Sequence, residues 1–224
     1  QRAANDPSIC QAKTALLAAQ TIKEYSRTLG IPIDVQNDPY KTGLIGQERT
    51  PITSDRGIVN AKILATNPNY AAAFVELLVK AKVHKGSLVA VGMTGSLPGW
   101  NLAFLAAGEA LDLKSIIIAS VGASDWGANL PSLTWLAMER VLNERGSLKY
   151  RSTAASYGGP SDNGRGLSPE GRDLIKSAID RNHVQFINEP TLQSSINKRV
   201  EVDDTARTGR QLACYVNIGG GSAS

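Results

Sequence analysis

Two apolar segments joined by a helix-like segment constrain the fold more than any other feature of this chain. SLVAV at 87–91 and SIIIASVG at 115–122 are largely apolar and show no alternation with polar residues. A strand of this kind has both faces covered, as in a parallel sheet flanked by helices. The segment 100–111 between them has helical spacing. The sequence therefore predicts a β–α–β unit, whose crossover is right-handed in nearly all known cases.

The remainder of the chain continues this alternation. A first helix is expected from Asp6-Pro7 to Gly30. Further helices are predicted over 55–66, from Asn67 onward, over 131–144, from a cap at Ser168-Pro169 onward, and over 191–200. Further strands are predicted over 44–48, near Ile52, from Leu148 onward, and within the segments VQFINEP and ACYVNIGGG. We therefore predict an α/β fold with a doubly wound, mainly parallel sheet and helices on both faces. Residues 1–224 read as one domain, with a lead-in helix in 1–39 and the sheet core in 40–224.

The ends of the chain predict that it continues in both directions. It opens on Gln1 rather than Met, and a targeting or anchor segment would precede it. It closes on a strand and a glycine-rich loop, where a doubly wound fold calls for a helix. No stretch approaches the ~20 uncharged apolar residues that span a bilayer, so we expect the chain itself to be a soluble domain.

Charge and cysteine content narrow the function classes. The formal charge of +4 mildly favours an anionic ligand. Nucleic acid is not expected as a partner, because no basic run interleaved with aromatics and no zinc-finger spacing occurs. Cys10 and Cys214 are too far apart in sequence for a local metal site and are either two buried residues or one long disulfide. No metal site is predicted, and no cofactor is indicated.

Five loops carry most of the glycine, hydroxyl and amide residues that could bind a ligand. Each follows a predicted strand, and in a parallel sheet such loops gather at one edge. They span 92–99, 122–131, 158–172, 188–190 and 217–221. His84 and His183 instead precede strands. A Ser-His-Asp triad or a His-ligated zinc is therefore not expected, and any hydrolysis would use carboxylates, hydroxyls or an added metal.

The first loop, GMTGSLPG, predicts an anion cradle at a helix N-terminus. Backbone N–H groups near Gly95 and the hydroxyls of Thr94 and Ser96 would face the ligand. The loop lacks the lysine of a P-loop and the spacing of GxGxxG. A plain strand-to-helix turn is the alternative.

The second loop offers Asp125, Trp126 and Asn129. Trp126 would stack on a ligand while the other two supply polar contacts, or else Asp125 or Asn129 simply caps the next helix. Glu139, farther along that helix, is expected to be a solvated residue rather than one that points at the site.

The later loops supply charged candidates. Arg165 and Arg172 would clamp a carboxylate, with surface salt bridges as the alternative. Glu189 would act as a general base or cation ligand, or else favour a helix entry through its charge. Asn217, Gly219 and Gly220 would close the binding loops from the last strand.

Several blocks in the same order resemble the bacterial poly-γ-glutamate system protein family. The resemblance runs from about residue 40 to the end and rests on GLIGQERTPITS, TNPNYAAAFVELL, VAVGMTGSLPGWN, SVGASDWGANLPSLTWLAMERVL, GRGLSPEGR and YVNIGGG. It implies a role in capsule or polymer formation at the cell envelope, with an N-terminal membrane anchor, a C-terminal extension and other synthase components as partners. It implies no catalytic residue.

Three functions follow as hypotheses. The first is an accessory of poly-γ-glutamate biosynthesis or export that binds the anionic polymer or a γ-glutamyl intermediate in the glycine-rich loops. The second is a hydrolase or transferase acting on a γ-glutamyl or phosphorylated substrate, with Ser96 as nucleophile or Asp125 and Glu189 in acid–base roles. The third is a scaffold of the synthase complex whose loops are only turns.

Overall fold

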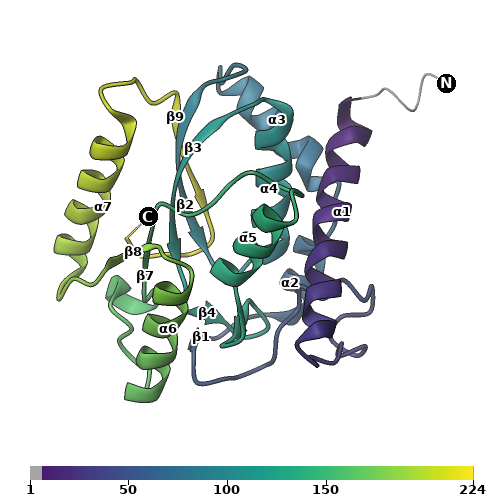
Figure 1. Cartoon of the computed structure of the whole chain (residues 1–224), viewed down its shortest axis with the longest axis vertical. Helices are drawn as coiled ribbons and strands as arrows, with labels where there is room; N and C mark the ends of the chain where they lie inside the picture. Colours follow the sequence, from purple (N-terminus) through teal and green to yellow (C-terminus); the bar gives the residue numbers. More distant parts are fainter. Residues whose placement is uncertain (1–6, 224) are drawn as a thin grey trace.

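The chain folds around a five-stranded sheet in which every strand is parallel to its neighbours. In this computed structural model, which describes residues 7–223, the strands are β2 (Leu88–Thr94), β3 (Lys114–Ser120), β7 (Ala154–Ser156), β8 (Gln185–Ile187) and β9 (Cys214–Ile218). Their spatial order is β8-β7-β3-β2-β9 (Figure 1). The predicted α/β fold with a doubly wound parallel sheet is confirmed.

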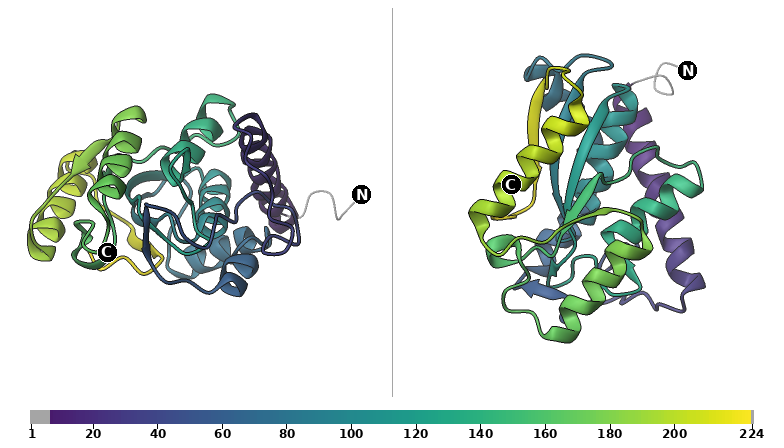
Figure 2. Two further views of the ribbon diagram at one scale, coloured as in Figure 1. Left: turned by 90° about the horizontal axis from the view of Figure 1, so that it is seen from below. Right: turned by 60° about the vertical axis from the view of Figure 1, so that its left-hand side comes forward.

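Helices pack against this sheet. Figure 1 shows α4 (Pro98–Ala110) and α5 (Trp135–Glu144) on one side of it, with α1 (Pro7–Thr28) and α3 (Tyr70–Lys80) outside α4. On the other side lies α7 (Leu192–Arg207), whose Val202 packs on Ile118, Ala154 and Ile187. Figure 2 shows the same layers from below and from the side. The shorter α2 (Val59–Ala65) packs near α4, and α6 (Pro169–Arg181) lies beside α5 and β8.

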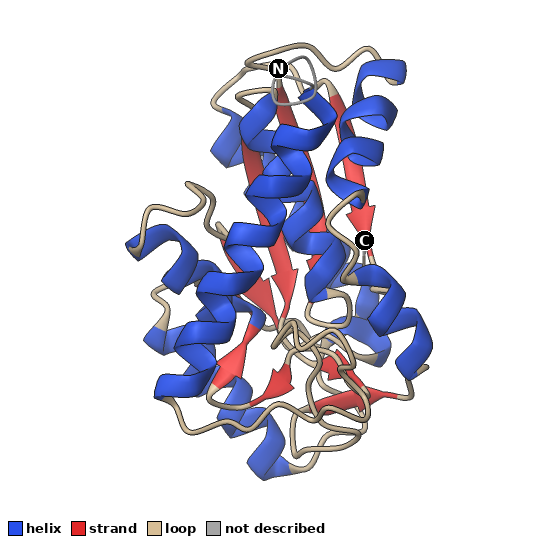
Figure 3. Cartoon of the chain, turned by 90° about the vertical axis from the view of Figure 1, so that its right-hand side faces the viewer, coloured by secondary structure: helices blue, strands red, loops and turns tan. Residues whose placement is uncertain are grey.

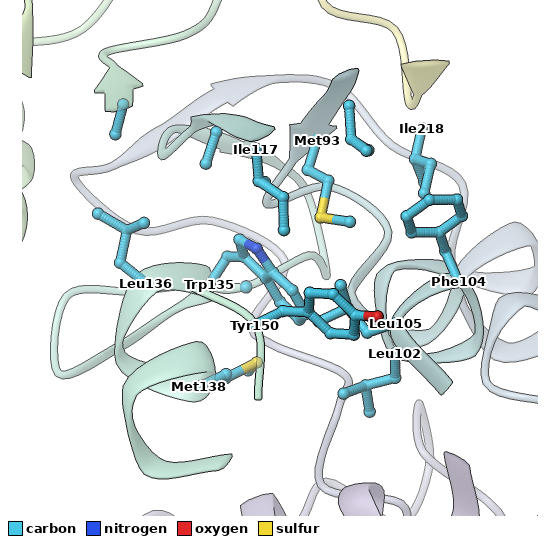
Figure 4. Close-up of a cluster of buried hydrophobic side chains, with 14 of the residues drawn as sticks. Met93, Leu102, Phe104, Leu105, Ile117, Trp135, Leu136, Met138, Tyr150 and Ile218 are labelled. Atoms are coloured by element: carbon cyan, nitrogen blue, oxygen red, sulfur yellow. The ribbon is translucent and has the colours of Figure 1, made fainter. Parts of the chain in front are cut away.

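The central strands are apolar because both of their faces are covered. Met93, Ile117 and Ile218, from β2, β3 and β9, point into one cluster with Phe104 and Leu105 of α4 (Figure 4). All seven residues of β2 are buried. Burying each such side chain contributes about 1.5–3 kcal/mol, so this cluster holds β2 rigidly beneath the loops that follow it.

The carboxyl ends of the main strands all point to one end of the molecule, where the small strands and a dense set of loops lie (Figure 3). There β1 (Thr53–Asp55) pairs in parallel with β4 (Ala123–Ser124). A hairpin of β5 (Asn129–Leu130) and β6 (Leu133–Thr134) precedes α5. The single turn η2 (Pro160–Asp162) interrupts the loop before α6. The predicted ligand-loop edge is therefore where these segments gather.

Several predicted boundaries were wrong. No strand forms over 44–48, because its backbone bonds to an irregular loop: Gly46 N donates to Trp126 O at 3.1 Å and Gln47 N to Asn129 Oδ1 at 3.1 Å. The helix predicted over 55–66 is shorter and forms only α2. The β5–β6 hairpin takes the place of the first residues of the helix predicted over 131–144. The helix predicted over 191–200 continues beyond residue 200 as α7. The Ser168 cap of α6 is confirmed, since its side chain accepts from Gly171 N. The proposed cap at Asp6 lies outside the described residues.

Two predictions about single side chains also need correction. Glu139 is completely buried rather than solvated, because Trp135 Nε1 donates to its carboxylate at 2.7 Å and Ser152 donates through both N and Oγ at 2.9 Å. Cys10 is exposed and Cys214 half-buried, and both are free, so neither alternative for the pair holds. No helix within residues 7–223 has the length and apolar character needed to cross a membrane.

Candidate functional site

The strand order places a pocket where the chain changes direction. β3, β7 and β8 lie successively to one side of β2, whereas β9 returns to the other side. Open α/β sheets bind ligands outside the carboxyl ends of the two strands at such a switch point. A cavity of about 500 Å³ lies there, which we call the switch-point pocket. Its lining includes Thr94, Ser96, Ser120, Gly122, Gly159, Pro160, Asn217, Gly219 and Gly220.

Glycine is required where β9 meets β2. Gly219 has φ +117°, which L side chains rarely adopt. A Cβ at this position would also collide with the side chain of Thr94. The glycine therefore allows the last loop to run directly over the end of β2 and close one wall of the pocket.

A lysine that sequence reasoning did not select reaches the pocket from α2. Lys62 is only 6% exposed. Its Nζ donates to Ser96 O at 2.7 Å and lies 2.6 Å from Ser124 Oγ. Gly57 makes room for it, since a Cβ there would lie 3.2 Å from Lys62 Cε and 2.6 Å from Asp125 O. The amine is thus held against two serine residues from two different loops.

Burial changes the acid–base behaviour of this amine. Removal from water disfavours the charged form and lowers the pKa of Lys62 from its usual 10.5 to about 8, although the nearby charge of Asp125 acts in the opposite direction. A lysine with a pKa near 8 has a useful neutral fraction near neutral pH. It can therefore accept a proton from a hydroxyl, which an ordinary surface lysine does poorly.

Ser124 is positioned by the small parallel sheet. It sits on β4 opposite Asp55 of β1, and its backbone N donates to Ser96 Oγ at 3.0 Å. Both serine side chains and Lys62 line the switch-point pocket. The hydroxyl of Ser124 is therefore within hydrogen-bond reach of a buried amine, the arrangement that activates a serine nucleophile, and Ser124 is one of the residues that line the cavity.

Asp125 supports this arrangement from behind. Its Oδ2 accepts from Gly57 N at 3.1 Å, which ties the start of α2 to the second loop. Its Oδ1 is buried without a hydrogen-bond partner in the described structure, and Arg49 Nη2 lies 3.8 Å away. The carboxylate contributes negative charge near Lys62 but is not itself part of the pocket lining.

A buried ion pair supports the wall beneath the pocket. Arg199 of α7 meets Asp162 at 2.9 Å, and their side chains are 6% and 2% exposed. The hydroxyls of Ser120, Ser156 and Ser195 complete the network. Because Ser120 also lines the pocket, this network fixes the wall between the second and third loops.

The structure brings together only part of the predicted site. Thr94, Ser96, Asn217, Gly219 and Gly220 line the switch-point pocket, and Gly95 lies beside it, with its N–H on Ser120 O. The pocket lining does not include Trp126, Asn129, Arg165, Arg172 or Glu189. The functional roles assigned to these residues stay predictions.

Local contacts account for two of the residues that lie outside the lining, and the position of a third in the sheet separates it from the pocket. Asn129 is buried, and its side-chain amide donates to Gln47 O and Thr53 Oγ1. Arg172 donates to Leu167 O at 2.8 Å. Glu189 follows β8, the strand at the far edge of the sheet from β9.

Sequence reasoning missed Lys62, Ser124 and Arg56, which all contribute to the pocket. Ser124 immediately precedes the predicted Asp125, so its loop was recognised but its role was not. Lys62 lies in the short helix VNAKILA, where a lysine among apolar residues gives a weak signal of burial. Only the packing of α2 against the second loop shows that these residues meet.

Comparison with protein-family models, with curated proteins and with solved structures gives no match to this chain. Within residues 7–223, no group of three or more His, Cys, Asp or Glu side chains is arranged so that it could hold a metal ion.

Proposed function

We propose that the switch-point pocket is the active site of a serine–lysine acyl hydrolase or acyltransferase. Ser124 is the nucleophile and Lys62 the general base. The observation that carries this proposal is the 2.6 Å approach of the buried Lys62 Nζ to Ser124 Oγ inside a cavity at the sheet's switch point. This reading keeps the predicted hydrolase or transferase without a catalytic histidine, and moves the nucleophile from Ser96 to its neighbour in space.

The reaction follows from these two groups. Neutral Lys62 takes the proton of Ser124 Oγ as the oxygen attacks an acyl carbonyl, which forms a tetrahedral intermediate. When the bond to the leaving amine or alcohol breaks, Lys62 returns that proton to the leaving group, and the acyl group remains as an ester on Ser124. Water or an acceptor amine then attacks the ester with Lys62 again as base, which releases the acyl product and restores the serine hydroxyl.

Backbone groups of the pocket can stabilise the negative oxygen of the intermediate. Leu97, Gly220 and Gly221 line the cavity, and their backbone N–H groups have no hydrogen-bond partner in the described chain. Leu97 also precedes the first turn of α4, where the helix dipole favours negative charge. Donors of this kind typically contribute roughly 3–4 kcal/mol each to transition-state stabilisation.

Two exposed charges at the pocket supply a basis for substrate choice. Asp55 and Arg56 both line the cavity, and neither forms an ion pair within the described residues. Side by side they complement the amino and carboxylate groups of an amino-acid end. The resemblance to the poly-γ-glutamate system family favours a γ-glutamyl amide, whose α-carbon carries both groups, as the substrate.

A second candidate is binding without chemistry. Loops that follow β2, β3, β7 and β9 converge on the pocket, and their glycine-rich backbone suits an anionic ligand. In that case the chain would serve as an accessory of polymer synthesis or export that holds a γ-glutamyl chain beside the other synthase components. Lys62 would then be a charged contact, and its removal would weaken binding instead of turnover.

The decisive experiment uses two substrates of different charge. Hydrolysis of p-nitrophenyl acetate reports the serine–lysine chemistry, and γ-glutamyl-p-nitroanilide reports recognition as well. Lys62→Met and Ser124→Ala should each lower turnover of both substrates by roughly 10²–10⁴-fold. Lys13 on α1 and Ser177 on α6 are exposed and form no side-chain hydrogen bond or ion pair within the described residues, so Lys13→Met and Ser177→Ala provide matched controls.

Mass spectrometry of the protein mixed with p-nitrophenyl acetate should place an acetyl group on Ser124. Acetylation of Ser96 instead would return the nucleophile to the residue first predicted. Unchanged turnover in Lys62→Met, or the absence of turnover and acylation in the parent protein, would reject the enzyme. Saturable binding of glutamyl oligomers without any acylation would then support the accessory role.

A further inference from the structure

A second cavity, which shares no lining residue with the switch-point pocket, opens between α5 and α6. It has a volume of about 930 Å³, within the range of small-molecule sites. Three guanidinium groups contribute to its lining: Arg140 from α5, Arg151 from the segment before β7, and Arg181 from the end of α6. Ser152, Asn182 and His183 also line it. We call it the arginine groove.

Most of the positive charge in the arginine groove is not neutralised by an ion pair. Arg140 pairs with Glu144 at 2.9 Å. In the part of the chain that the structure describes, neither Arg151 nor Arg181 has a carboxylate within 4.0 Å. The buried carboxylate of Glu139 lies behind Ser152 and interacts with Arg151 through its charge alone. Two arginine residues that line the cavity thus lack a direct anionic partner.

Neutral neighbours hold these guanidinium groups in place. Arg151 Nη2 donates to Asn182 O at 2.8 Å, and Arg181 Nη2 to Pro131 O at 3.1 Å. Asn182 is itself buried, donates to Ala178 O and accepts from Arg140 Nε at 3.1 Å. Bonds to backbone carbonyls orient a guanidinium without cancelling its charge. The groups are therefore organised before any ligand arrives, which lowers the entropic cost of binding.

One donor in the groove is left without an acceptor. The Nε of Arg151 is buried and has no hydrogen-bond partner among the described residues. Because this buried atom has almost no accessible surface, a ligand in the groove would contact the other nitrogens of the Arg151 guanidinium. Guanidinium groups bind carboxylate and phosphate in a bidentate manner, so groups from three separate elements suit a ligand with several such oxygens.

We propose that the arginine groove binds a small anion that carries two or more carboxylate or phosphate groups. The ligand would bridge Arg151 and Arg181, and Arg140 would add positive charge from beside its ion pair with Glu144. This site is separate from the switch-point pocket, because none of its lining residues is shared with that pocket. The proposal therefore does not depend on the serine–lysine chemistry.

Isothermal titration with citrate and with inorganic pyrophosphate, each against the full chain at low ionic strength, tests the proposal. We expect one saturable site for at least one probe, and the stronger probe distinguishes a carboxylate ligand from a phosphate ligand. Arg151→Ala and Arg181→Ala should each weaken binding about tenfold or more, and Arg181→Lys should restore only part of it, because lysine keeps the charge but not the planar fork.

Arg210→Ala serves as the matched control, since Arg210 is exposed and does not line the groove. It removes the same charge and should leave binding unchanged. Should Arg151→Ala fail to fold, Arg181→Ala still tests the proposal. The Arg181 side chain makes one hydrogen bond, to the backbone carbonyl of Pro131, so its removal should leave the fold intact. Absence of saturable binding for both probes, or equal affinity in the Arg181→Ala and Arg210→Ala variants, would overturn the proposal.

Discussion

Replacing Lys62 by methionine tests whether its amine acts in catalysis or only stabilises the fold. Methionine keeps much of the length of the side chain but removes the charge and both hydrogen bonds, to Ser96 O and to Ser124 Oγ. The free energy of unfolding then changes for two reasons of opposite sign. The variant no longer buries a charge, which stabilises it, and it leaves Ser96 O without a partner, which costs about 1–3 kcal/mol.

The pH dependence isolates the first of these effects. A fall of the lysine pKa from 10.5 to about 8 means that the folded state holds its proton less tightly than the unfolded state. Below pH 8 the charged amine therefore destabilises the fold by about 3 kcal/mol, at 1.36 kcal/mol per pH unit, and this penalty disappears as the pH rises from 8 to 10.5. The lost hydrogen bonds carry no such dependence.

Thermal unfolding of the parent and of Lys62→Met at pH 7 and pH 10.5 measures the difference. The melting temperature of the parent, relative to the variant, should rise between these pH values by roughly 6–12 °C, because 1 kcal/mol corresponds to about 2–4 °C for a chain of this size. In the same series, kcat/KM of the parent for p-nitrophenyl acetate should rise about tenfold per pH unit up to pH 8 and then level off.

The result that would refute this reasoning is a constant difference in melting temperature across the pH range. It would show that Lys62 has an ordinary pKa in the folded state, so that hardly any neutral amine exists at pH 7. Loss of turnover in such a protein would then have to come from displaced loops. Lys13→Met, an exposed change on α1, should show neither the pH-dependent difference nor a loss of turnover.

Three further predictions concern the surrounding framework. Complete burial raises the pKa of Glu139 to about 7. As the pH rises from 4.5 to 7, the free energy of unfolding of the parent, measured with urea, should therefore fall by up to about 3 kcal/mol relative to that of Glu139→Gln. An equal pH dependence of the unfolding free energy in the two proteins would contradict the raised pKa. Asp162→Asn should destabilise the fold by about 3–5 kcal/mol, because it leaves the buried Arg199 without a counter-charge, and a change below about 1 kcal/mol would show that water reaches the pair. Gly219→Ala should lower the free energy of unfolding by at least about 1 kcal/mol and should also lower turnover. The new methyl group would collide with Thr94, and the backbone φ at this position favours glycine. Normal turnover would mean that the last loop is not part of the site.

Local sequence patterns predicted the framework well because the framework depends on burial. Non-alternating apolar runs such as those around Val89 and Ile117 are typical of strands covered on both faces, and the Ser168 cap marked a helix start correctly. The prediction of a strand over 44–48 was wrong because this segment depends on tertiary contacts rather than on a local pattern of burial. Its backbone groups find partners in the loop around Gly127, a contact between distant segments that no local pattern records.

The sequence by itself determined the parallel α/β architecture, the edge at which the glycine-rich loops gather, and the exclusion of His84 and His183 from that edge. Tertiary structure alone decided which loop residues meet. Ser124 and Lys62 are separated by 62 positions, and neither belongs to a recognisable motif. Their contact depends on the pairing of β1 with β4 and on the packing of α2, and the altered pKa of Lys62 depends on how completely that packing removes water. The chemistry proposed for this site therefore depends on burial and on the approach of distant residues, which arise only when the chain is folded.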